Sequence, residues 1–383
     1  MSSGSNLATR MEMVETSSPG SATPQAGASG ASGAPPPPAK PPRPRRTPER
    51  FCHVLKLAGF AFLVPFVRLA AGEDPRMQLK ELWRSLGVPL LAMLMFGLMW
   101  SFFAARIETS LGRIPGPAAV WQQAGALWVD HKAERQREKE FQERQAVRNA
   151  ALLAEDPTAE PSKVRYTGRP TYLDQILTSL KTVFTGFLFA TLLAVPIGIL
   201  CGMSRTLEAA FNPFVQVFKP ISPLAWLPLV TLLVSALYVS ENPVFEKSFL
   251  VSAITVALCS LWPTVINTAL GVASIDRDLL NVAKVLKLDW KTRLLKLVLP
   301  SSLPLIFTGM RLSLGVGWMV LIAAEMLAQN PGLGKFVWDE FQNGSADSMS
   351  RMLVAVFTIG FIGFLLDRVM QTLQGLTDFG ARR

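Results

Sequence analysis

Long apolar stretches alternate with short polar ones along most of this 383-residue chain. Helices in lipid satisfy their own backbone hydrogen bonds, and no alternating strand pattern competes with a helical interpretation. Six stretches are long enough to cross a bilayer, at residues 86–105, 183–203, 221–239, 250–270, 303–327 and 352–370. The pattern therefore predicts an all-α polytopic membrane protein with six transmembrane helices.

The N-terminal part of the chain differs in composition from the rest. Residues 1–48 are rich in Gly, Ser, Ala and Pro, which cannot bury a core, so we expect a disordered tail. Residues 49–85 form a basic segment just before the first span. Within it, residues 54–71 are apolar but broken by charges and a proline, which favours a helix on the membrane surface.

A long polar insertion, residues 106–172, separates the first two spans. Residues 119–154 are rich in Ala, Gln, Glu and Arg and predict a solvated helix, followed by a proline-containing linker at residues 156–170. Two helical ion pairs are expected, Glu134 with Arg137 and Glu140 with Arg144. The insertion either docks an extracytoplasmic partner or is merely tolerated, and the second role is favoured.

The basic residues indicate an orientation. They outnumber acidic residues in residues 40–84 and again in residues 273–299. An even number of spans separates these two segments, so both can face the cytoplasm as the positive-inside rule requires. Both termini, including a C-terminal tail at residues 373–383, are then cytoplasmic, and residues 106–172 lie outside.

Composition excludes several other classes. The chain is 50% hydrophobic and 17% charged, which is typical of a membrane protein. Its net charge is +10, but the basic residues cluster beside apolar spans, as in cytoplasmic loops, so we expect no nucleic-acid partner. The two histidines and three cysteines show no spacing for a metal, disulfide or catalytic site. The sequence also lacks a G-x-x-x-x-G-K-[ST] motif for binding ATP.

A basic amphipathic segment stands between the fourth and fifth spans. Ile275, Leu279, Val282 and Leu286 fall at helical spacing and form one apolar stripe. Asp289 is positioned to cap a second short helix that starts at Trp290. From the residues alone, such a helix can fill a groove on a partner protein or lie on the lipid surface.

This segment resembles the EAA loop of ABC-transporter permeases, whose pattern is E-A-A, three residues, G, nine residues, I-x-L-P. The matching positions here are Asn281, Val282, Ala283, Lys287, Leu297, Leu299 and Pro300. The spacing fits, although the Glu and the Gly of the pattern are both replaced. We call residues 273–300 the elbow.

The surrounding sequence resembles one branch of these permeases, which serves nitrate, sulfonate and taurine. Similar segments lie at residues 114–121, 179–202, 219–229 and 301–342. The elbow is most similar to nitrate and bicarbonate permeases, because sulfonate and taurine members usually keep a Gly where Lys287 stands. The tail and residues 128–170 fall outside the likeness.

The resemblance implies a type I ABC permease domain over residues 173–372. Two permease copies would form the pathway, cytoplasmic ATPases would bind ATP-Mg and dock on the elbows, and a separate extracytoplasmic protein would bind substrate. The chain itself would hold no cofactor and catalyse no reaction. It would sit in the inner membrane and pass a small anion, nitrate first, with bicarbonate, cyanate and sulfonate or taurine as alternatives. A secondary transporter is a weaker alternative. The implied coupling residues are Leu279, Asn281, Val282, Ala283, Leu286, Lys287, Asp289, Trp290, Leu299 and Pro300.

Polar residues inside the spans are the candidates for a translocation path. Arg311 lies about 16 Å along a helix from Pro300, near the bilayer interior. It either serves as a cavity charge for an anion or forms a structural pair, and the structural role is favoured. Glu325 is expected to lie too far along the same helix to pair with it. Thr308, Ser313, Thr255 and Thr264 either line a path, bond to their own backbone or, as the default, hold helices together.

Overall fold

The computed structural model describes residues 52, 63–72, 75–109, 112–156, 164–239, 244–345 and 347–381. The predicted tail at residues 1–48 lies outside the described residues, as does the first half of the predicted surface helix at residues 54–71. The end of that segment forms helix α2, Val64–Ala70.

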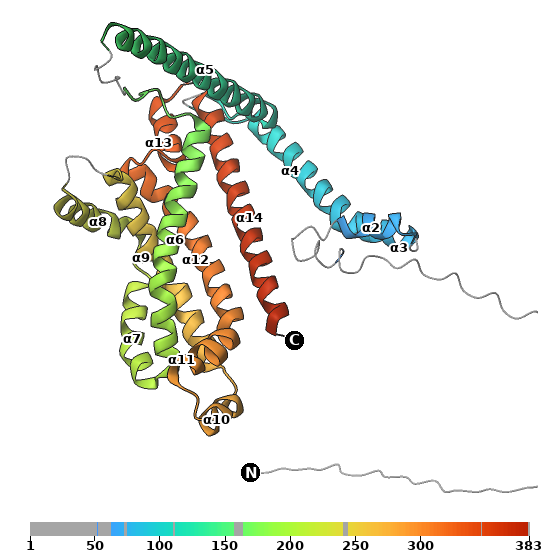
Figure 1. Ribbon diagram of the computed structural model, residues 1–383. Coiled ribbons are helices and arrows are strands. Elements are labelled where there is room, and N and C mark those ends of the chain that lie inside the picture. The colour runs from blue at the N-terminus through green and yellow to red at the C-terminus, as the bar shows by residue number, and fades with distance from the viewer. Residues whose placement is uncertain are drawn as a thin grey trace, which may run out of the picture. The chain divides into compact units, whose positions relative to one another are not determined.

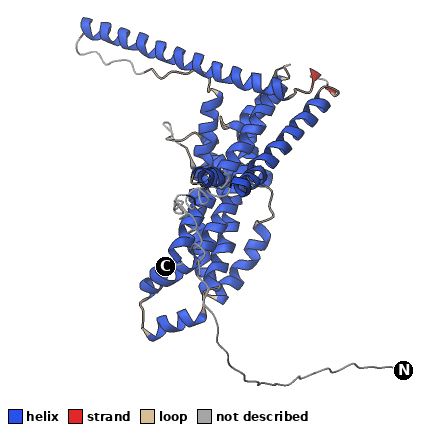
Figure 2. Cartoon of the chain, turned by 90° about the vertical axis from the view of Figure 1, so that its right-hand side faces the viewer, coloured by secondary structure: helices blue, strands red, loops and turns tan. Residues whose placement is uncertain are grey.

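The described chain is helical almost throughout, with one pair of two-residue strands (Figures 1 and 2). The elements after α2 are α3 Pro75–Leu82, η2 Trp83–Gly87, α4 Val88–Ala104, β1 Glu108–Thr109, β2 Gly112–Arg113, α5 Pro117–Glu155, α6 Tyr172–Met203, α7 Arg205–Phe218, α8 Pro223–Leu237, α9 Lys247–Ala273, α10 Arg277–Val285, α11 Trp290–Arg293, η3 Leu294–Val298, α12 Leu299–Ala328, α13 Leu333–Asn343 and α14 Ser348–Ala381. Helix α14 continues through most of the predicted C-terminal tail.

Among the described residues, five helices are long and apolar enough to span a membrane. They are Pro75–Ala104, Tyr172–Met203, Lys247–Ala273, Trp290–Ala328 and Ser348–Leu376. Helices α7 and α8 pass the same test only as a pair, bent by 101°. The predicted span at residues 221–239 is therefore the second half of a broken element, because Pro220 and Pro223 disfavour continuation of the helix between them. With the pair counted once, six spans result, and the polytopic all-α prediction is confirmed.

Two of the spans contain a π-helical stretch within their first half. Each stretch precedes a proline: η2 comes before Pro89, and η3 comes before Pro300. Proline lacks an N–H group and its ring clashes with the carbonyl four residues earlier, so the wider π turn accommodates it. As a result, α11, η3 and α12 form one continuous helix, and the elbow connects directly into a span.

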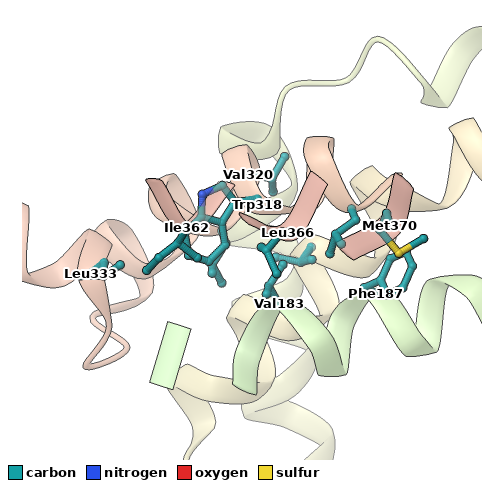
Figure 3. Packing of buried hydrophobic residues seen from close by; sticks show 11 residues of the cluster. Val183, Phe187, Trp318, Val320, Leu333, Ile362, Leu366 and Met370 are labelled. Atoms are coloured by element: carbon teal, nitrogen blue, oxygen red, sulfur yellow. The ribbon is translucent and has the colours of Figure 1, made fainter. Parts of the chain in front are cut away.

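Helices α6, α9, α12 and α14 surround the main core (Figure 1). Val183, Trp318 and Leu366 belong to it (Figure 3). The Trp318 indole nitrogen donates to the main-chain oxygen of Ile359 at 3.0 Å. Small residues bring the helices close together. A Cβ on Gly198 would meet the side chain of Thr268 on α9. Such close approach is how helices associate in lipid, where the hydrophobic effect between them is weak.

The insertion contains one 39-residue helix, α5, as predicted. The expected Glu134–Arg137 pair is present at 3.3 Å. The expected Glu140–Arg144 pair is wrong, because the Arg144 guanidinium donates to the main-chain oxygen of Glu140 while the Glu140 carboxylate accepts from Gln136.

Side-chain contacts fix α5 to the rest of the protein. Arg135 pairs with Asp174 at the start of α6, at 2.6 Å between Nη2 and Oδ2. The Tyr166 hydroxyl of the linker donates to Glu134 at 2.7 Å, and this hydrogen bond raises the pKa of Tyr166 above its usual value. The insertion is thus anchored at a defined place, the N-terminal end of α6.

Candidate functional site

Helix α10 is capped at its N-terminus and packs against neighbouring helices. The Asp276 carboxylate caps its first turn by accepting from the Asp278 N–H at 2.9 Å. Ile275 and Ala283 are buried, and Ile275 packs with Val272 of α9 and with Val298 of η3. These residues hold α10 against the end of α9 and against η3.

Four apolar side chains on α10 and at its C-cap are exposed in the isolated chain. Leu279 is 48% exposed, Val282 54%, Val285 81% and Leu286 64%. We call these four residues the elbow face. Ile275 was predicted to belong to the same stripe, but it is 8% exposed and packs inside the chain. The sequence pattern did not predict the burial of Ile275, because helical spacing alone does not show which residues of a stripe pack against the other helices.

The C-terminus of α10 explains how a lysine can stand where the EAA pattern has glycine. Lys287 adopts a left-handed backbone with φ 48°. The Leu288 N–H donates to the Ala283 oxygen and the Lys287 N–H to the Lys284 oxygen, which together form a Schellman motif. Glycine is favoured there because it has no Cβ. Here Lys287 keeps the same turn with a side chain present.

The second half of the elbow differs in one respect from the prediction. Asp289 holds the position before α11, but its side chain makes no capping hydrogen bond. Trp290 is 56% exposed next to it, and Asn281 is exposed on α10. Leu299 and Pro300 form the first turn of α12. The predicted coupling residues thus lie at one end of the bundle, and most of them are accessible.

Arg311 has a defined partner. Its Nε lies 2.5 Å from Asp367 Oδ1 and its Nη2 lies 3.2 Å from Asp367 Oδ2, which joins α12 to α14. Asp367 was missed from the sequence, although it is the single acidic residue in the predicted last span. Gln371 also donates to Asp367 at 2.8 Å. A structural pair is one of the two roles expected for Arg311.

The small hydroxyl residues are also engaged within the chain. Thr308 and Thr255 donate to main-chain oxygens one turn earlier in their own helices. Ser313 of α12 donates to the Ser260 oxygen and contacts Thr264 of α9. Ser313 and Thr264 thus join α12 to α9, and Thr308 also accepts from Gln374 of α14 at 2.9 Å. The hydrogen bond of Thr255 stays within α9.

Glu325 lies fully buried at the other end of α12. Its carboxylate accepts from the Ser179 hydroxyl of α6 at 2.8 Å and from the Gly334 N–H of α13 at 2.9 Å. It therefore sits at the N-terminus of α13, where the helix dipole favours an anion. As expected, it does not pair with Arg311. It joins three helices at one point.

Comparison with known proteins identifies the family. The profile described as the inner-membrane component of binding-protein-dependent transport systems matches residues 194–377. The nitrate import permease protein NrtB of Synechococcus elongatus is 36% identical over 196 residues, which are 51% of this chain and 66% of that protein. The bicarbonate transport system permease protein CmpB of the same organism is 37% identical over 201 residues, 52% of this chain and 67% of that protein. This chain belongs to that ABC-permease family.

The family match places the described elements in context. It includes the end of α6 and all of α7 to α13, so the elbow and Arg311 lie inside it, whereas α2 to α5 lie outside. The chain spans about two thirds of the length of these relatives. Among solved structures, the inward-facing methionine ABC transporter MetNI aligns over 54% of this chain and 95% of that chain, with 14% identity and a TM-score of 0.46. A likeness of that degree says nothing further about this chain.

Proposed function

We propose that this chain is the pathway-forming subunit of an ATP-driven importer for a small inorganic anion, coupled to cytoplasmic ATPases through its elbow. The elbow face carries the proposal. Four neighbouring apolar side chains are exposed on one side of a short, capped helix that connects two spans. Exposed apolar faces of this kind mark interaction sites. An amphipathic helix that fills a groove on a partner uses the same arrangement of anchors.

The elbow is built to transmit a movement to the spans. Ile275 and Ala283 fix α10 to the bundle, and η3 continues without a break into α12. A force applied to the elbow face would therefore act on α12 and, through Arg311 and Asp367, on α14. A second copy of the permease and an extracytoplasmic binding protein complete the proposed importer. ATP hydrolysis is assigned to the ATPase subunits.

An orientation test follows from the exposed positions of α5 and α10. In a variant without the native cysteines, Val147→Cys on α5 should react with an impermeant maleimide from outside, and Val285→Cys on the elbow face should be protected. Both side chains are well exposed, at 72% and 81%. Reaction of the Val285 site with protection of the Val147 site would invert the proposed topology.

The substrate is proposed as nitrate, with bicarbonate as the second candidate. The elbow sequence favours both over sulfonates, and relatives named for the two anions match this chain at nearly equal identity. The binding protein encoded beside this permease can decide between them. Calorimetric titration of that protein should show tight binding of nitrate and weak binding of bicarbonate. The reverse order would assign the importer to bicarbonate, and binding of neither anion would remove this substrate class.

A further inference from the structure

A groove lies at the start of the first span, outside the family match. Its volume is about 760 Å³, within the usual range for a small-molecule site. Apolar side chains line it, chiefly Phe66 of α2, Leu79 of α3, Trp83 of η2 and Leu90 of α4. Arg76 and Lys80 stand at its rim. An apolar groove with a cationic rim is complementary to an amphiphile that has an acyl chain and an anionic head.

The basic residues at this groove are arranged on one helix face. Arg76, Lys80 and Arg84 follow each other at four-residue intervals, which places them in one stripe. All three are exposed, and among the described residues none has a carboxylate within ion-pair distance. The stripe runs beside the apolar residues of the groove rather than opposite them. The cations are therefore available to a ligand that enters the groove.

The depth of the stripe in the membrane follows from the length of the span. The continuous helix Pro75–Ala104 has 30 residues and measures about 45 Å, which equals the full bilayer with its headgroups. Its apolar part begins after Arg84. Lys80 and Arg76 lie one and two turns beyond that boundary, about 6 and 12 Å further along the axis. That position is the headgroup layer, where phosphates are found.

We propose that this groove binds one anionic phospholipid, with an acyl chain between Phe66, Leu79 and Trp83 and the phosphate at Arg76 and Lys80. Charge complementarity and the depth of the cations argue for a lipid from the surrounding leaflet as the occupant. The site couples α2 and α3 to the membrane surface. It is independent of the transported substrate and of the elbow.

Native mass spectrometry of the full chain, released from nanodiscs of mixed phosphatidylglycerol and phosphatidylcholine, tests the proposal. The wild type should retain one phosphatidylglycerol per chain in preference to phosphatidylcholine. The double variant Arg76→Gln with Lys80→Gln should lose that preference by on the order of tenfold, since each cation near the surface contributes to the binding of anionic lipid. Leu79→Ser should weaken retention of both lipids, because it removes an apolar wall.

A matched control removes the same number of positive charges from another helix. Lys139→Gln with Arg148→Gln changes two exposed cations of α5 and should leave lipid retention unchanged. Equal retention of phosphatidylglycerol by wild type and by the Arg76 and Lys80 variant would overturn the proposal, as would equal retention of both lipids by wild type. Efficient disulfide formation between two copies carrying Leu79→Cys would also overturn it, because a second chain would then occupy the groove.

Discussion

The Arg311 guanidinium and the Asp367 carboxylate form a two-point ion pair between α12 and α14, at 2.5 and 3.2 Å. Both residues lie within predicted membrane spans, where an unpaired charge is costly. Nearly two fifths of each side chain is exposed in the isolated chain. The pair therefore has an intermediate environment, between a fully buried and a surface ion pair.

Removing one member of this pair should destabilise the protein more than removing both. Arg311→Gln or Asp367→Asn leaves a charge without its partner, and we expect each to cost about 1–3 kcal/mol. The double variant should recover a large part of that loss. Thermal unfolding in detergent and the yield of purified protein measure the effect. If the losses of the two single variants simply add in the double variant, with no recovery, the pair is not a unit.

An i,i+4 ion pair within α13 provides the comparison. Lys335 and Asp339 lie one turn apart and contact at 2.7 Å. Lys335→Gln should change stability by less than about 0.5 kcal/mol, since pairs of this type contribute little. An equal effect of Lys335→Gln and Arg311→Gln would mean that the position of Arg311 between two spans has no special role.

The contact between α12 and α13 predicts opposite effects for two glycines. A Cβ on Gly334 would meet the main-chain oxygen of Ile322 and the Cβ of Glu325, and neither can move aside. Gly334→Ala should therefore cost about 1–3 kcal/mol. Gly315 has open space around it, so Gly315→Ala should raise stability by up to about 1 kcal/mol through helix propensity. Thermal unfolding compares the two, and a loss for Gly315→Ala would show that another chain fills that space in the membrane.

The sequence predicted the spans well and their connections less well. Spans such as α9 and α12 follow from continuous apolar composition, which lipid requires of any crossing helix. The α7–α8 break could not be located in the same way, because α8 alone has the composition of a span and only its 15-residue length and the bend set it apart. The predicted Glu140–Arg144 ion pair is wrong, because i,i+4 spacing permits an ion pair but does not exclude competing hydrogen bonds.

The backbone at Lys287 gives a further prediction. A non-glycine residue with left-handed φ is strained by roughly 1 kcal/mol or more. Lys287→Gly should therefore stabilise α10 by about 1 kcal/mol. Lys284→Gly removes the same charge from within the helix and should destabilise it by a similar amount. Hydrogen exchange of the α10 amides should slow in the first variant and accelerate in the second. Identical changes in both would attribute the effect to charge rather than to backbone conformation.

The elbow residues were predictable from spacing, whereas the partners of the intramembrane charges were not. Leu279, Val282 and Leu286 stand in a helical stripe that the structure leaves exposed. The contacts of Arg311 with Asp367 and of Glu325 with Ser179 join residues from separate helices. No local pattern encodes such contacts, because they depend on how the spans pack together.

Replacement of Leu286 tests the elbow face. Leu286→Asp places a charge where an apolar groove of the ATPase is proposed to bind, so copurification of the ATPase should fall at least tenfold. Leu286→Ala should reduce it less. Leu153→Asp, at an exposed leucine of α5, is the matched control and should have no effect. Wild-type copurification with Leu286→Asp would remove the elbow face from the proposed interface.

ATP-driven uptake of labelled nitrate by proteoliposomes decides between an ABC importer and a secondary transporter. The vesicles should contain this chain with its ATPase, with ATP supplied on the elbow side and the binding protein on the other. We predict nitrate uptake that requires both ATP and the binding protein and that Leu286→Asp abolishes. Uptake that proceeds without ATP and follows an ion gradient would contradict the assignment.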